Sequence, residues 1–140
     1  MTTAPRILVI DDDDDFVQSL RALLEREGYA VLHAPDGQEG VLQARRTRPD
    51  LIVVDVMMQE RTEGFFVVQE LRRVPELAGT PIFVVSAVYE RTPEFDVPPA
   101  SDWMAHDGFF PKPIDATSLL DAVRTALATR SHADTQGDHR

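Results

Sequence analysis

The chain has 140 residues, enough for one globular domain and a short tail, and its 43% hydrophobic content predicts a packed core rather than disorder. The formal net charge is −10 and no basic stripe is visible, so we expect no direct nucleic-acid binding. Since the sequence has no cysteine, no apolar leader and no apolar run long enough to span a bilayer, we expect a cytoplasmic protein without disulfides or membrane association.

Three short apolar runs predict the buried strands of a parallel sheet. They lie at 7–10, 51–54 and 82–85, are rich in β-branched residues, and do not alternate with polar residues. This pattern is typical of strands that are covered on both faces. Residues 30–32 and 108–110 are weaker candidates for two further strands.

Amphipathic stripes between and after these runs predict helices, because their apolar residues recur at helical spacing. A glycine or proline follows each of the first three stripes, as is common beyond the end of a helix. The predicted helices are Asp14–Glu27, Asp36–Arg46, Glu63–Arg73 and Asp115–Thr129.

The alternation of strands and helices predicts an α/β fold with a doubly wound, five-stranded parallel sheet and right-handed crossovers. We expect one domain over residues 1–130 and a flexible polar tail over 131–140. Residues 88–107 break the alternation, because three prolines interrupt them and no clean helical stripe is present. We therefore expect an irregular loop there in place of a regular fourth helix.

Polar side chains follow four of the predicted strands. They are Asp11 and Asp12 after the first strand, Asp55 after the third, Ser86 after the fourth and Lys112 after the fifth. In open α/β sheets, sites form beyond the carboxyl ends of the strands. The three carboxylates can hold a hard divalent cation, one of them can act as a nucleophile, and the hydroxyl and ammonium groups can donate to phosphoryl oxygens.

Simpler explanations exist for each of these residues. In the aspartate run at 11–15, the last three can merely cap the following helix and favour its dipole. Asp55 and Ser86 could simply end their strands, and Lys112 could be a surface residue. The first two aspartates are not explained by capping, and Lys112 is the only lysine in the chain. Their joint occurrence at strand ends favours a site.

The histidines are not part of this predicted site. His33, His106, His132 and His139 show no spacing typical of metal ligands, so we expect them at the surface or in the tail.

The ordered set of motifs resembles the signature of response-regulator receiver domains. The motifs are Ile10-Asp11-Asp12, the run from Val54 to Met58, Ser86-Ala87 and Lys112-Pro113, and the resemblance covers residues 6–128. It implies a flavodoxin-like receiver fold with strand order 2-1-3-4-5. The region of the fourth helix departs from the family pattern, which puts the usual signalling surface of the family in doubt.

The resemblance also implies a role for each matching residue. Asp55 is the implied phosphoacceptor. Mg²⁺ is the implied cofactor, held by Asp12, Asp55 and the backbone carbonyl of Met57, with Asp11 binding it directly or through water. Ser86 is implied to donate a hydrogen bond to a phosphoryl oxygen and to act as a switch residue. Lys112 is implied to form an ion pair with Asp55 and the phosphoryl group. Phe109 is the implied aromatic switch residue.

On this basis we expect a stand-alone response regulator that receives its phosphoryl group from a histidine kinase or phosphotransfer protein. It would signal through contacts with a downstream protein that the sequence does not identify, and it would not be an enzyme beyond assisting its own phosphorylation and dephosphorylation. The alternative is a pseudo-receiver that acts as a scaffold without phosphorylation. An aspartate-nucleophile phosphatase would need a carboxylate at Met57, and the aspartates at 11–15 would repel a flavin phosphate.

Overall fold

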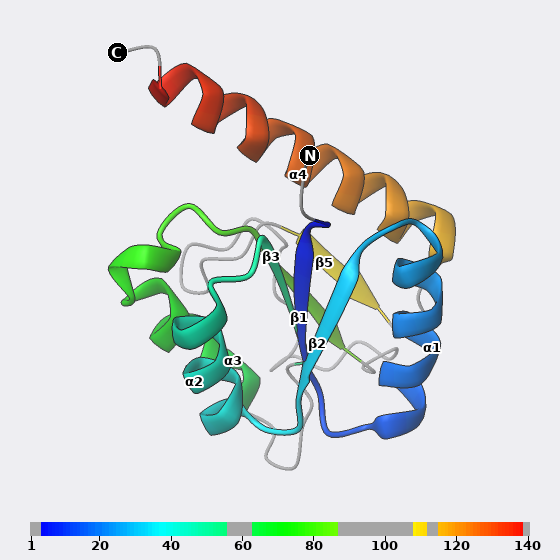
Figure 1. Ribbon diagram of the computed structural model, residues 1–140. Coiled ribbons are helices and arrows are strands. Elements are labelled where there is room, and N and C mark those ends of the chain that lie inside the picture. The colour runs from blue at the N-terminus through cyan, green and yellow to red at the C-terminus, as the bar shows by residue number, and fades with distance from the viewer. Residues whose placement is uncertain (1–3, 56–62, 87–107, 112–114, 139–140) are drawn as a thin grey trace.

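A five-stranded parallel sheet with helices on both faces forms the protein (Figure 1), which we describe from a computed structural model over residues 4–55, 63–86, 108–111 and 115–138. The strand order is β2-β1-β3-β4-β5, which confirms the predicted order. The strands are β1 (Arg6–Ile10), β2 (Ala30–Ala34), β3 (Leu51–Asp55), β4 (Ile82–Ser86) and β5 (Gly108–Pro111). The helices are α1 (Asp14–Arg26), α2 (Gly37–Thr47), α3 (Glu63–Arg72), the 3₁₀ helix η1 (Pro75–Leu77) and α4 (Ala116–Asp138).

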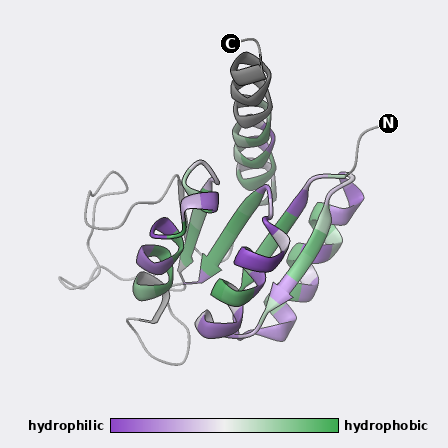
Figure 2. Ribbon diagram, turned by 60° about the vertical axis from the view of Figure 1, so that its left-hand side comes forward, coloured by the Kyte–Doolittle hydropathy of each residue, from purple (hydrophilic) through white to green (hydrophobic). Residues whose placement is uncertain are grey.

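Strands β1, β3 and β4 are apolar over most of their length because both of their faces are buried. Within β1, Ile7 and Val9 pack into one hydrophobic cluster with α1 and α4, whereas Leu8 and Ile10 pack into a second cluster with α2 and α3. Successive strand side chains point to opposite faces, so one apolar run supplies both clusters. Figure 2 shows the strands mostly in the colour of hydrophobic residues, while the helices carry both colours.

The first two helices begin where the sequence predicts them, at aspartate caps. The Asp13 carboxylate accepts hydrogen bonds from the backbone N–H groups of Asp15 and Phe16, at 3.1 and 3.2 Å. The Asp36 carboxylate accepts one from the N–H of Glu39 at 2.8 Å. These caps satisfy N–H groups that have no partner within the helix. For Asp13, helix capping is therefore the correct explanation.

Helix α2 lies in close contact with the end of β1, and a glycine makes this contact possible. A Cβ atom at Gly40 would lie 2.5 Å from Cδ1 and 2.8 Å from Cγ1 of Ile10, which is fully buried. Such distances are far below ordinary carbon–carbon contact. Because Ile10 directly precedes Asp11, this packing fixes the backbone from which the first carboxylate extends.

The last helix is longer than the sequence predicts. Leu119 and Val123 of α4 are buried in the cluster with α1, and the helix continues to Asp138. The predicted end at Thr129 is wrong: residues 130–136 contain no proline or glycine, the residue types that most strongly disfavour a helix. The flexibility of residues 131–140 stays a prediction.

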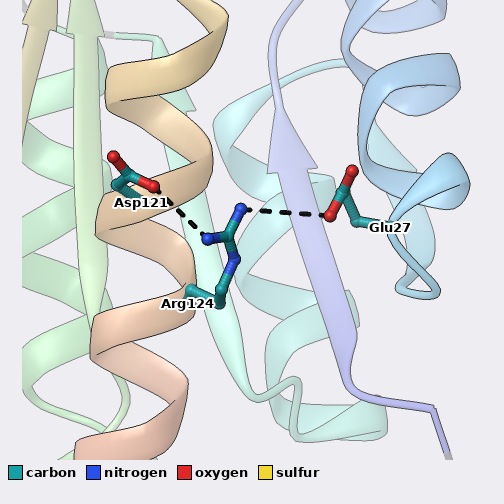
Figure 3. A network of polar contacts seen from close by, with 3 residues as sticks. All are labelled: Glu27, Asp121 and Arg124. Atoms are coloured by element: carbon teal, nitrogen blue, oxygen red, sulfur yellow. Dashed lines mark hydrogen bonds and ion pairs between the residues drawn. The ribbon is translucent and has the colours of Figure 1, made fainter.

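Near its packed end, α4 is joined to α1 by an exposed group of ion pairs (Figure 3). The Arg124 guanidinium lies 3.4 Å from a carboxylate oxygen of Asp121 and 4.0 Å from one of Glu27, directly after α1. All three side chains are at least 37% exposed. Such pairs contribute little to stability, so the apolar contacts hold α4 in place.

Several predictions fall outside the described residues. They concern the irregular loop at 88–107 and the positions of Met57 and Lys112. Over the residues that the structure describes, no helix is long and apolar enough to cross a membrane.

Candidate functional site

Three carboxylates meet at the carboxyl edge of the sheet. Asp11 and Asp12 follow β1, and Asp55 ends β3. These two strands are neighbours, with Ile10 opposite Val54, so parallel register brings the next residue of each strand to the same level. One carboxylate oxygen from each aspartate lies within 4.8 Å of the others. We call these three residues the carboxylate cluster.

The carboxylate cluster fits a hard divalent cation. Ligands around one Mg²⁺ lie about 2.0–2.1 Å from the ion in octahedral geometry, so two of them are about 3 or about 4 Å apart. The spacing within 4.8 Å is close to that arrangement. Asp11 and Asp55 are 0% and 3% exposed, and like charges held this close and this deep repel one another. A bound cation offsets this repulsion, and carboxylate oxygens are the ligands that Mg²⁺ prefers.

The carboxylate cluster is open on one side. Asp12 is exposed, unlike its two neighbours. A cation held by the cluster would therefore keep positions for water or for an oxygen of an incoming group. A site with protein ligands on one side and solvent on the other suits a reaction with an external substrate.

Asp11 is held by a set of backbone hydrogen bonds. Its own N–H donates to the carbonyl of Ala34 at 3.1 Å, and one of its carboxylate oxygens accepts from the N–H of Asp13 at 2.9 Å. The turn after β1 is thus tied both to β2 and to the start of α1. This arrangement fixes the direction of the Asp11 carboxylate.

His33 contacts the same turn from β2, which the sequence did not predict. Its Nε2 lies 2.9 Å from the carbonyl oxygen of Asp11, and because a carbonyl only accepts, Nε2–H is the donor. The side-chain amide of Gln43 on α2 donates to the His33 carbonyl at 2.8 Å. His33 is half-buried and is not a simple surface residue as expected. The signal that could have indicated this contact is the pairing of β1 with β2, because it places His33 opposite Val9, two residues before Asp11.

The remaining predicted residues are placed only in part. Ser86 is the last residue of β4, opposite Pro111, so its backbone lies at the same edge of the sheet as the carboxylate cluster. Phe109 lies in β5, opposite Val84. Lys112 directly follows Pro111 but lies outside the described residues, as does Met57. The roles of these residues stay predictions.

Comparison with known proteins points to one family. The response regulator receiver domain matches residues 7–124 of the chain. Protein PilH of Pseudomonas aeruginosa is 30% identical over 126 residues, which cover 88% of this chain and 98% of PilH. The DNA-binding dual master transcriptional regulator RpaA of Synechocystis is 35% identical over 88% of the chain, but there the match spans only 49% of the relative.

Solved structures agree with the fold. A putative response regulator from Chloroflexus aurantiacus superimposes with a TM-score of 0.78 at 25% identity, over 90% of this chain and 99% of that one. The chemotaxis response regulator CheY4 of Vibrio cholerae superimposes with a TM-score of 0.75 at 29% identity, over 89% of this chain and 99% of that one. Both are similar in fold across nearly the whole described core.

Proposed function

Because this chain belongs to the response regulator receiver domain family, we propose that it is phosphorylated on Asp55, with Mg²⁺ as cofactor, by a histidine kinase or phosphotransfer protein. The observation that carries this proposal is the carboxylate cluster, in which two of the three acidic side chains are buried and all three lie within reach of one ion. Carboxylates held this close together repel one another, and a phosphoryl-transfer site that uses a divalent cation provides a reason to retain them.

In the proposed reaction, a carboxylate oxygen of Asp55 attacks the phosphorus of the donor's phosphohistidine. The new P–O bond forms as the P–N bond breaks, and the nitrogen keeps the electron pair of that bond. When bound, Mg²⁺ supplies positive charge that neutralises the phosphoryl oxygens. Asp11 and Asp12 would hold the cation beside Asp55. The strand backbone fixes Asp55, and such positioning accounts for much of the catalysis of phosphoryl transfer.

Two further groups would contact the phosphoryl oxygens. Ser86 would donate a hydrogen bond and Lys112 would provide a positive charge, while Met57 would offer its backbone carbonyl to the cation. Support comes from the ends of β4 and β5, which bring Ser86 and Pro111, the residue before Lys112, side by side at the edge where Asp55 lies. Phe109 on β5 would then report the change as a switch residue.

We further propose that the protein acts in the cytoplasm through contacts with another protein and turns over no separate substrate beyond its own phosphorylation and dephosphorylation. PilH, a relative that this chain nearly spans, supports a stand-alone regulator. The chain spans about half the length of other relatives, such as RpaA and the response regulator MprA of Mycobacterium leprae. An output that does not depend on phosphorylation, as in a pseudo-receiver, is the alternative.

Intact mass spectrometry after incubation with acetyl phosphate tests the proposal. We expect a gain of one phosphoryl group in the wild type with Mg²⁺, and none with a chelator or in the Asp55→Asn variant. Asp15→Asn is the matched control, since Asp15 lies in the same acidic run but is exposed in the first turn of α1 and should still be phosphorylated. A folded wild type that gains no mass under these conditions would favour the pseudo-receiver.

A further inference from the structure

Two large hydrophobic side chains are exposed on neighbouring helices, and both line one groove. Leu42 of α2 is 47% exposed and Phe66 of α3 is 63% exposed, and no other large hydrophobic residue is exposed in the part of the chain that the structure describes. Helices α2 and α3 lie side by side on one face of the sheet (Figure 1). The groove between them has a volume of about 490 Å³ and is also lined by Gln38, Val41, Val67 and Glu70. We call it the α2–α3 groove.

The fold itself does not require these exposed side chains. Helix α3 is anchored to the sheet by Val67, Val68 and Leu71, which are at most 4% exposed, whereas Phe66 faces away from that core. Removing a side chain such as phenylalanine or leucine from water is typically worth about 1.5–3 kcal/mol. An apolar patch left open at this cost commonly marks a binding surface.

The position of the α2–α3 groove, between two helices that contact each other, suits a third helix. Two adjacent helices on a sheet leave a furrow into which a third helix can pack with its side chains between theirs. Helices bind such grooves through apolar anchors at positions i, i+3, i+4 and i+7.

The charge at one end of the α2–α3 groove narrows the choice of partner. Arg45 and Arg46 are exposed and follow Val41 and Leu42 by four residues, so they continue the groove-facing stripe of α2 by one turn. Residues 40–47 and 66–73 contain four arginines and one acidic residue, Glu70, in a chain whose net charge is −10. The Glu70 carboxylate is itself paired with the Arg73 guanidinium at 3.3 Å. This end of the groove is therefore basic in an acidic protein.

We propose that the α2–α3 groove binds an amphipathic helix of a partner protein. The apolar side of that helix would cover Leu42 and Phe66, and acidic residues in its first turn would face Arg45 and Arg46. This orientation runs the partner helix antiparallel to α2, so that its positive N-terminal end meets the negative C-terminal end of α2. A second copy of this acidic chain is a poorer occupant, because two bodies of charge −10 repel each other. The proposal does not depend on Asp55, which does not line the groove.

The probe is a synthetic helical peptide with leucines at i, i+3, i+4 and i+7 and glutamates in its first turn, titrated into the ¹⁵N-labelled full chain. We expect saturable shifts of the amides of Leu42 and Phe66, and binding at least about tenfold weaker for a peptide with lysines in place of the glutamates. Charge reversal in Arg45→Glu/Arg46→Glu should invert that preference. Asp55→Asn should bind the acidic peptide as the wild type does.

Phe66→Ser should abolish binding, whereas Gln18→Ser, an exposed change on α1, should not. If Phe66→Ser fails to fold, Leu42→Ser provides the same test. The proposal is overturned if the acidic peptide causes no saturable shift in the groove, or if acidic and basic peptides bind equally. It is also overturned if the chain self-associates through this surface and Phe66→Ser abolishes that self-association, because the occupant is then a second copy.

Discussion

The carboxylate cluster and the α2–α3 groove depart from the usual pattern of burial in opposite ways. At the cluster, charged Asp11 and Asp55 lie inside the protein; at the groove, apolar Leu42 and Phe66 lie outside. Neighbouring buried carboxylates repel one another, and exposed apolar patches commonly mark contacts. Neither arrangement is one that folding alone favours, and our two proposals give each a function: cation binding at the carboxylate cluster, and contact with an apolar helix surface at the groove.

The largest effect should come from removing a ligand of the carboxylate cluster. Asp12→Asn replaces one of three carboxylates that lie within 4.8 Å of one another, so Mg²⁺ affinity should fall about 100-fold. Isothermal titration calorimetry of the metal measures this directly. Because Asp12 is exposed, the free energy of unfolding without metal should hardly change. Equal Mg²⁺ affinity in the variant and the wild type would contradict the placement of the cation.

The next effect concerns the contact that fixes the backbone before Asp11. Gly40→Ala should lower the free energy of unfolding by about 1–3 kcal/mol, because the added methyl group would overlap with the buried Ile10 side chain. Denaturant unfolding gives the value. Gly79→Ala is the matched control, since a Cβ there meets no atom within 4 Å. If both variants are equally stable, the close packing of α2 on β1 is not a constraint.

A smaller effect is expected at His33. His33→Phe removes the hydrogen bond at 2.9 Å to the Asp11 carbonyl, and partners of this kind commonly change metal affinity about tenfold when they are lost. We expect about tenfold weaker Mg²⁺ binding, and partial recovery in His33→Gln, whose amide can still donate. A loss of unfolding free energy in the metal-free protein with unchanged Mg²⁺ affinity would assign His33 a structural role only.

The smallest effect on stability should come from the groove. Phe66→Ser changes a side chain that is 63% exposed, so the free energy of unfolding should stay within about 0.5 kcal/mol of the wild type. Thermal unfolding monitored by circular dichroism tests this. Val68 lies on the same helix but is fully buried, so Val68→Ser should by contrast cause a large loss of unfolding free energy. Similar losses in both variants would mean that Phe66 belongs to the core.

Much of the fold and of the site could be predicted because, in a parallel sheet, the residues that follow the strands all lie at the same edge. Apolar runs covered on both faces indicate the strands, and the residue after each run then lies at one edge, which is how Asp11, Asp12 and Asp55 come together. The aspartate caps of α1 and α2 follow from local hydrogen bonding alone. These inferences need only neighbours in sequence and one rule of topology.

Other features depend on pairings that the sequence does not display. His33 contacts Asp11 only because β2 and β1 share a particular register, across 22 positions of the chain. Helix α4 continues past Thr129 because residues 130–136 contain no proline or glycine that would end it there. The exposure of Phe66 depends on which side of α3 packs against the sheet. The sequence does not reveal this side, because Phe66 is followed directly by two further apolar residues, Val67 and Val68, which are buried.

Reduction of the phosphorylated protein with borohydride, followed by peptide mass mapping, identifies the residue that carries the phosphoryl group. Hydride reduces an aspartyl phosphate to homoserine and releases phosphate, so the modified residue is marked permanently. We expect homoserine at position 55, formed only when Mg²⁺ and a phosphoryl donor were both present. Homoserine at another aspartate, or none in a folded protein that had gained a phosphoryl group, would contradict it.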